Sequence, residues 1–172
     1  MPDITAVLRR TLAAAALCAT LLTTMGVWAV PSDAEQPIHI RADAAELDEA
    51  KGIATYTGSV RMDQGTLRVT ADTMVIELKN EQVVRITAVG KRAHYQQQLR
   101  TKESEVLADA ETIVYHTQDE RVELIGDAFL TQDGNEFRGQ TIRYDMRAGK
   151  VDAKADQAGG VQMILKPARP GP

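Results

Sequence analysis

The stretch that decides the fold is Thr55–Asp72, which reads TYTGSVRMDQGTLRVTAD. Apolar and polar residues alternate on both sides of Asp63-Gln64-Gly65, whose residue types favour a turn. The apolar positions of one face are Tyr56, Val60 and Met62 before the turn and Leu67, Val69 and Ala71 after it. Two alternating runs joined by a short turn predict a β-hairpin with one buried face.

Parts of this hairpin recur along the chain. A small residue followed by Asp or Gln, with an apolar residue four positions on, appears as Ala42-Asp43 with Leu47, Ala71-Asp72 with Ile76, Ala108-Asp109 with Ile113, and Gly139-Gln140 with Tyr144. A glycine six residues before a glutamine appears as Gly58 with Gln64, Gly90 with Gln96, and Gly126 with Gln132. Repeats of this length are typical of stacked supersecondary units, and here each unit is expected to be two or more strands.

Two segments have a composition that is more typical of helices than of strands. The segments 41–51 and 102–111 are rich in Ala, Glu and Leu, which favour helix. The repeat nevertheless aligns both with clear strands, so we interpret them as strands. Gln96 to Glu105 is polar and is expected to be a long hairpin loop, and Gln132–Asn135 is expected to be a turn. The sequence therefore predicts an all-β fold, a sandwich or a roll.

The N-terminus has the pattern of a secretory signal peptide. Arg9-Arg10 precedes an uncharged run, and Val27-Trp28-Ala29 offers suitable residues for cleavage. A retained membrane anchor is the alternative, although threonines and Gly26 dilute the run. The expected organisation is a signal peptide at 1–29, a flexible N-terminus at 30–36, one β-domain at 37–165 and a disordered tail at 166–172.

Composition argues against several classes of function. The net charge is −4 and aromatic residues are only 4% of the chain, so a nucleic-acid partner is not expected. The single cysteine, Cys18, lies in the expected signal peptide and cannot form an internal disulfide. The chain is long enough for one domain.

No catalytic or metal signature stands out. None of the serines at 32, 59 and 104 lies in a nucleophile elbow, and His39, His94 and His116 lack the spacing of paired ligands. The acidic residues near Asp43 show no calcium-loop pattern. A catalytic carboxylate pair is an alternative that the pattern leaves open. We expect no enzyme activity, no metal and no cofactor.

The motifs together resemble a known family. Gln36-Pro37-Ile38-His39-Ile40, Tyr56-Thr57-Gly58, Leu124-Ile125-Gly126-Asp127-Ala128 and Gly139–Tyr144 match the OstA-like LptA family of periplasmic lipopolysaccharide transport proteins. The similarity spans about residues 36–165. It implies a twisted, open-ended antiparallel β-jellyroll that lies in the periplasm and stacks end to end with copies of itself. The implied partners are lipopolysaccharide, bound through its lipid A acyl chains, the inner-membrane Lpt extractor complex and the outer-membrane Lpt translocon.

The resemblance also implies two sets of residues. The interior that would hold lipid comprises Ile38, Ile40, Leu67, Val69, Met74, Ile76, Ile86, Tyr95, Ile113, Tyr115, Leu124, Ile142 and Tyr144. The head-to-tail interface comprises Pro37, Ile38, His39, Ile40, Val161, Met163 and Leu165. The scarcity of large rings is expected to leave room inside the roll.

Pattern alone leaves other functions open. The same apolar residues would form the plain core of any β-roll. A periplasmic glycan- or protein-binding β module is the main alternative, and it would be expected to expose aromatic residues. An unrecognised hydrolase is a third possibility, and it would need an acid–base cluster.

Overall fold

The structure is a computed structural model that describes residues 32–99, 104–155 and 159–167. These belong to one compact unit, Pro31–Pro172. The elements are the 3-10 turn η1 (Asp33–Glu35) and the strands β1 (His39–Arg41), β2 (Ala44–Asp48), β3 (Ile53–Gln64), β4 (Leu67–Lys79), β5 (Gln82–Gln98), β6 (Glu105–His116), β7 (Arg121–Gln132), β8 (Asn135–Asp145), β9 (Lys150–Lys154) and β10 (Gln162–Ile164). The predicted all-β fold is confirmed.

The described strands form one antiparallel sheet in nearly sequential order. The path is β1-β3-β4-β5-β6-β7-β8-β10, with β2 also paired to β3 and β9 also paired to β8. The sheet therefore has two edges: β1 and β2 form the N-terminal edge, and β9 and β10 form the C-terminal edge. Neither edge pairs back onto the other, so the sheet stays open, as the resemblance implies.

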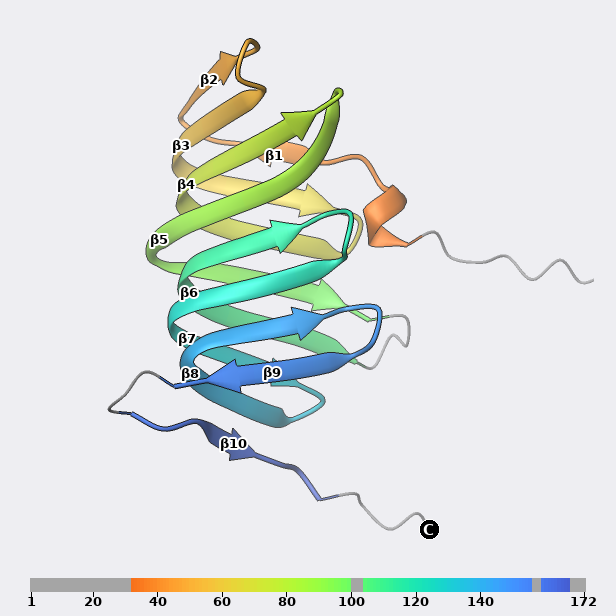
Figure 1. The fold of residues 1–172 in the computed structure, drawn as a ribbon, viewed down its shortest axis with the longest axis vertical. Coiled ribbons are helices and arrows are strands. Elements are labelled where there is room, and N and C mark those ends of the chain that lie inside the picture. Colours follow the sequence, from red (N-terminus) through yellow and green to blue (C-terminus); the bar gives the residue numbers. More distant parts are fainter. Residues whose placement is uncertain (1–31, 100–103, 156–158, 168–172) are drawn as a thin grey trace, which may run out of the picture. The chain divides into compact units, whose positions relative to one another are not determined.

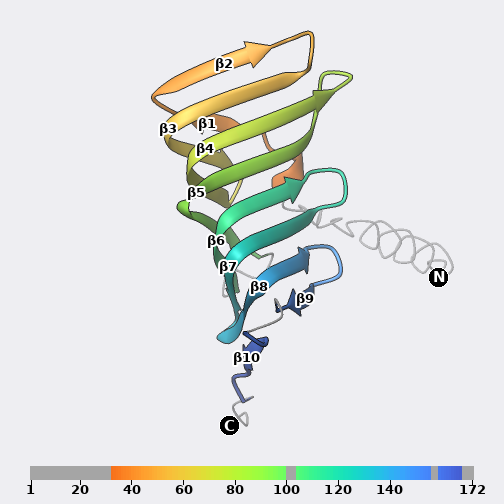
Figure 2. The same cartoon turned by 60° about the vertical axis from the view of Figure 1, so that its left-hand side comes forward.

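The long strands bend near their middle, and the bends double the sheet over (Figure 1). Each bend coincides with a register shift, for example between Thr57 and Val60 on β3 and between Ile125 and Ala128 on β7. One half of each strand thus lies in one layer and the other half in the facing layer (Figure 2). The layers enclose the core between them, which gives the jellyroll architecture. The described hairpin turns of both layers lie on the side opposite the bends (Figure 1).

The bends explain part of the sequence repeat. Gly58 has φ +81° at the β3 bend, and a Cβ there would lie 2.8 Å from the Cβ of Asp43. Gly126 has φ +83° at the β7 bend, and a Cβ there would lie 2.9 Å from the Cβ of Glu111. A glycine is required at both positions because the neighbouring acidic residue occupies that space and the backbone is left-handed.

Two details of the predicted repeat are wrong. The acidic residue at the β6 bend is Glu111, after Ala110, whereas Ala108-Asp109 lies two residues earlier in regular pairing with β7. On β5 the bend between Val89 and Ala93 holds three residues, while the corresponding shift on β3 holds two. The extra residue moves the repeated glutamine from Gln96 to Gln97.

The segments with helical composition are strands. β1 and β2 cover most of 41–51, and β6 starts at Glu105. Cross-strand pairing and burial outweigh helix propensity there, because β6 has neighbours on both sides. The expected long loop after Gln96 is shorter than predicted, since β5 continues to Gln98 through pairing with β6.

The chain ends are described only in part. The expected signal peptide, with Cys18, lies outside the described residues, as do 168–172 of the expected tail. Within the expected flexible N-terminus, Asp33–Glu35 form η1, which is tied to the sheet by hydrogen bonds described below. In the expected tail, the backbone N–H of Lys166 donates to Oδ1 of Asn135 at 3.0 Å. No helix among the described residues is long and apolar enough to cross a membrane.

Candidate functional site

The inner face of the folded sheet is built from apolar rows that cross every strand. In one layer, paired residues form the row Leu47, Ala54, Ile76, Ile86, Tyr115, Val122, Tyr144 and Val151. The adjacent row is Ala45, Tyr56, Met74, Ala88, Ile113, Leu124, Ile142 and Ala153. In the facing layer the row is Ile40, Met62, Val69, Tyr95, Ala108, Leu130, Phe137 and Met163. None of these rows contains a charged residue.

The rows are buried in the middle and exposed at their ends. Met62, Leu124 and Ile142 are fully buried. At the N-terminal edge Leu47 is 58% exposed, and at the C-terminal edge Met163 is 52% exposed. Exposed apolar side chains are usually scattered singly over a protein surface. Leu47 and Met163 instead continue rows of buried apolar residues. The interior therefore reaches the solvent at both sheet edges.

Most residues predicted for the interior do lie there. The buried ones are Leu67, Val69, Met74, Ile76, Ile86, Tyr95, Ile113, Tyr115, Leu124, Ile142 and Tyr144. Ile38 and Ile40 are partly buried and pack against the same core, as expected at an edge. The set predicted to hold lipid omits two buried residues: Met62, which the alternation of the hairpin did place inward, and Leu130. It also missed the exposed end at Leu47.

The residues predicted for the head-to-tail interface lie on opposite edges. Pro37, Ile38, His39 and Ile40 are at the N-terminal edge, while Val161, Met163 and Leu165 are at the C-terminal edge and largely exposed. Within one copy, the two groups therefore stay apart. The edges also differ in charge: Glu46, Asp48 and Glu49 are at the first, and Lys150, Lys154 and Lys166 at the second.

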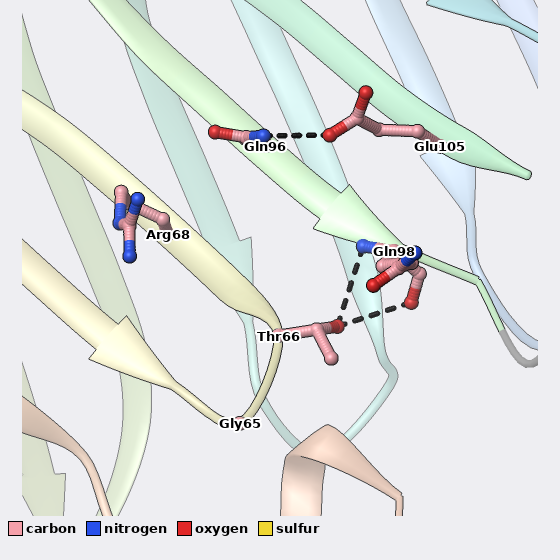
Figure 3. Close-up of a pocket in the computed structure, with 6 residues that line it drawn as sticks. All are labelled: Gly65, Thr66, Arg68, Gln96, Gln98 and Glu105. Carbon is pink, nitrogen blue, oxygen red and sulfur yellow. Dashed lines mark hydrogen bonds between the residues drawn. The ribbon is translucent and has the colours of Figure 1, made fainter. Parts of the chain in front are cut away.

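Side chains fill the space between the layers. Buried residues of both layers form one continuous core cluster, so the roomy interior expected from the low aromatic content is not observed. A depression of about 230 Å³ is lined by Gly65, Thr66, Arg68, Gln96, Gln98 and Glu105 and is polar (Figure 3). It lies on the outer face and offers no apolar chamber.

Three tyrosines bring hydroxyl groups into the apolar interior. Burial raises the pKa of the Tyr115 phenol to about 12, with smaller contributions from the Glu120 and Asp33 carboxylates. Burial likewise raises the pKa of Tyr95 and Tyr144. The Tyr95 hydroxyl donates to Oε1 of Gln97 at 2.6 Å. All three phenols therefore stay neutral at physiological pH.

The outer face carries the charged groups. Asp63 accepts hydrogen bonds from Arg61 and Arg68, both at 2.8 Å, and these bonds lower its pKa. Nδ1 of His94 lies 2.9 Å from Oδ1 of Asp109. Among the described residues, no group of three or more His, Cys, Asp or Glu side chains could hold a metal ion.

The fold and its interior define a class: an open antiparallel β-jellyroll with an apolar inner face that extends from edge to edge. A family model described as LptA/(LptD N-terminal domain) LPS transport protein matches residues 39–150. The chain belongs to this family, as its motifs suggested.

Individual relatives are similar over most of their length. Lipopolysaccharide export system protein LptH of Pseudomonas aeruginosa is 40% identical over 138 residues, which are 80% of this chain and 78% of the relative. Lipopolysaccharide export system protein LptA of Escherichia coli K12 is 30% identical over 151 residues, 87% of this chain and 81% of the relative. The crystal structure of the Pseudomonas aeruginosa LptH, a periplasmic component of the lipopolysaccharide transport device, superimposes with a TM-score of 0.74 at 35% identity, covering 80% of this chain and 100% of that chain.

Proposed function

We propose that this protein is a non-enzymatic periplasmic carrier that binds lipopolysaccharide between its two layers and passes it along a bridge of stacked copies between the inner and outer membranes. The proposal deepens the family assignment with one structural observation. The apolar rows run without a charged residue from Leu47 at one edge to Val151 at the other, and from Ile40 to Met163. A continuous apolar path is what an acyl chain needs to cross the protein.

The energetics require that the path be continuous. Each methylene group that leaves an apolar environment for water costs about 0.8 kcal/mol. An acyl chain of about a dozen carbons would therefore cost on the order of 10 kcal/mol to expose fully. A polar gap along the rows would be a barrier to movement. The rows Ile40–Met163 and Leu47–Val151 contain no such gap.

Stacking of copies would extend the path. All strand pairs are antiparallel, and the open edges present unpaired backbone groups that favour strand addition. If β9 and β10 of one copy meet β2 and β1 of the next, the alternation of strand direction continues. Row continuity then places Val151 beside Leu47 of the second copy, and Met163 beside Ile40 of the second copy. In this register Lys150, which lies 3.1 Å from Asp152, would come beside Asp48 of the second copy, which lies 2.7 Å from Lys51, so that opposite charges would meet across the edge.

The chain offers a matched pair of positions for a test. Its two phenylalanines lie on opposite faces of neighbouring strands: Phe137 belongs to an inner row, whereas Phe129 is on the outer face under the guanidinium of Arg138, 4.4 Å from the ring centroid. A photoreactive phenylalanine analogue would replace either residue with little change in shape. Each variant would be irradiated with purified lipopolysaccharide, and the adducts identified by mass spectrometry.

The expected result is a lipopolysaccharide adduct at position 137 and none at position 129. Equal labelling at both positions would indicate adsorption to the surface and would contradict the proposal. Adducts with glycans or proteins alone would favour the alternative binding module.

A further inference from the structure

The segment Ser32–Gln36, here called the strap, lies against the ends of β3, β4 and β5. It contains η1, in which the backbone N–H groups of Glu35 and Gln36 donate to the carbonyls of Ser32 and Asp33, both at 3.0 Å. Figure 1 shows η1 on the side opposite the bends. The strap therefore lies on the hairpin-turn side of the folded sheet, against the ends of β3, β4 and β5.

The Asp33 carboxylate binds the strap to the β3–β4 turn and to β5. Oδ1 of Asp33 accepts from the backbone N–H of Thr66 at 2.7 Å, and Oδ2 accepts from the Thr66 hydroxyl at 2.6 Å and from Nε2 of Gln97 at 2.8 Å. The Thr66 hydroxyl also lies 3.0 Å from the carbonyl of Gln98 (Figure 3), but the contact with the carboxylate is shorter. Three donors, two from Thr66 in the β3–β4 turn and one from Gln97 on β5, thus converge on a single carboxylate.

Gln97 connects the hydrogen bonds of Asp33 to the apolar interior. Gln97 accepts the hydroxyl proton of Tyr95, which is buried in an inner row, and that hydroxyl also lies 3.3 Å from Sδ of Met146 in the other layer. An anion at the position of the Asp33 carboxylate would therefore be connected through Gln97 to the buried Tyr95. The site is therefore at the boundary between polar and apolar surroundings.

A second polar group under the strap is incompletely satisfied. Gln64 is only 4% exposed, and its Nε2 donates to the carbonyls of Ala34 at 3.3 Å and Gln36 at 3.1 Å. Its Oε1 has no hydrogen-bond partner. An unpaired buried acceptor is costly, and a hydroxyl or amide donor of a ligand would satisfy it.

The outer arginines are poorer candidates for an anion site. Arg61 and Arg68 are both bound to Asp63, and Arg143 lies 3.3 Å from Glu123. All three point away from the interior, so a phosphate bound there would hold its acyl chains on the wrong face. The donors around Asp33 combine anion binding with access to the inner rows.

We propose that Thr66 and Gln97 form a binding site for the phosphate group of a phosphorylated lipid, and that the Asp33 carboxylate occupies this site until the cargo displaces the strap. The inference rests on the proposed lipid-carrier function and adds a defined head-group site to it. The strap thereby acts as an internal competitor: the Asp33 carboxylate holds the donors of Thr66 and Gln97 when no lipid is present, and the anion of the cargo replaces it there.

The test compares strap variants of the purified protein. Asp33→Asn keeps the shape but removes the charge, and Asp33→Ala removes the contacts altogether. Glu35→Ala is the matched control, because Glu35 belongs to the same turn and its exposed side chain has no hydrogen bond among the described residues. Far-UV circular dichroism would verify the fold. The ligands are phosphorylated lipid A, the same lipid after phosphatase treatment, and inorganic phosphate.

Asp33→Ala is expected to bind phosphorylated lipid A about tenfold tighter than the wild type, a difference of about 1.4 kcal/mol, because the variant lacks the charged competitor that accepts the site's hydrogen bonds. Asp33→Asn should show a smaller gain and Glu35→Ala none. Adding Gln97→Leu to Asp33→Ala should abolish the gain, and the phosphatase-treated lipid should not show it.

Three results would overturn the site. They are equal affinities for Asp33→Ala and Glu35→Ala, an equal gain with the dephosphorylated lipid, and binding of inorganic phosphate by Asp33→Ala as tight as that of the lipid, which would assign the site to free phosphate. If the wild type bound no lipopolysaccharide at all, the carrier function itself would fail.

Discussion

Substitution of the glycines by alanine tests how the strands bend. Gly58→Ala would place a methyl group 2.8 Å from the Cβ of Asp43 on a backbone with φ +81°. A left-handed residue with a side chain costs about 1–2 kcal/mol, and overpacking of a rigid neighbour adds about 1–3 kcal/mol. We expect a loss of about 3 kcal/mol in the free energy of unfolding.

Substitution of two other glycines distinguishes the cost of the left-handed backbone from the cost of overpacking. Gly149 has φ +61° and would meet no atom within 4 Å, so Gly149→Ala isolates the backbone cost, about 1 kcal/mol. Gly90 has no positive φ, and its nearest contact would be 3.3 Å from the backbone N of Asp72. Gly90→Ala should therefore change the stability by less than about 1 kcal/mol.

The assay is urea denaturation followed by far-UV circular dichroism, with all variants measured at one pH and salt concentration. The expected order of destabilisation is Gly58→Ala, then Gly149→Ala, then Gly90→Ala. If Gly58→Ala were no more destabilising than Gly149→Ala, the close contact with Asp43 would have no energetic role, and the argument that the acidic residue and glycine of the repeat form one structural unit would be refuted.

Three further predictions concern the interior and the edges. Leu130→Ala should destabilise the protein by about 2–5 kcal/mol in the same urea assay, because Leu130 is 1% exposed and leaves a cavity; a loss below about 1 kcal/mol would contradict tight packing. Unfolded tyrosine ionises near pH 10 and folded Tyr115 near pH 12, so the stability due to neutral Tyr115 is complete below about pH 10 and is lost as the pH rises toward about 12; Tyr115→Phe should reduce this alkaline loss in thermal melts, and an unchanged pH profile would disprove the role of burial. Leu47→Asp should abolish self-association in sedimentation experiments and change the free energy of unfolding by less than about 0.5 kcal/mol, because Leu47 is exposed at the edge. Glu46→Gln, on the opposite face of β2, should leave self-association unchanged. If Leu47→Asp still self-associated, edge stacking would be contradicted.

The alternation around Gly65 was sufficient to predict the β-architecture. Tyr56, Met62 and Leu67 each face inward because period-two alternation directly reports which face of a strand is buried. The repeat predicted the succession of strands and correctly outweighed the helical composition of 105–111. These signals are local, so one sequence is enough to read them.

The bends could not be placed from the sequence with the same accuracy. Ala108-Asp109 and Ala110-Glu111 fit the small-acidic pattern equally well, and only pairing with β7 identifies Glu111 as the partner of Gly126. The position of Gln97 depends on one extra residue in the β5 bend, which no local pattern marks. The strap was missed because Asp33 gains its partners from residues more than thirty positions away.

The strands are paired in one continuous antiparallel order, so their number determines how long the molecule is from edge to edge. The ladder from the N-terminal to the C-terminal edge has eight positions, counting β1 with β2 and β9 with β10 as one each. At about 4.8 Å per strand, one molecule advances such an array by roughly 38 Å. In the proposed stack of copies, the antiparallel alternation would continue from one copy to the next because eight is even, and the stack would end in β1 and β2 at one terminus and in β9 and β10 at the other. The length of such a stack would change only by whole molecules, so the distance between two membranes would be matched by the number of copies rather than by stretching any one of them.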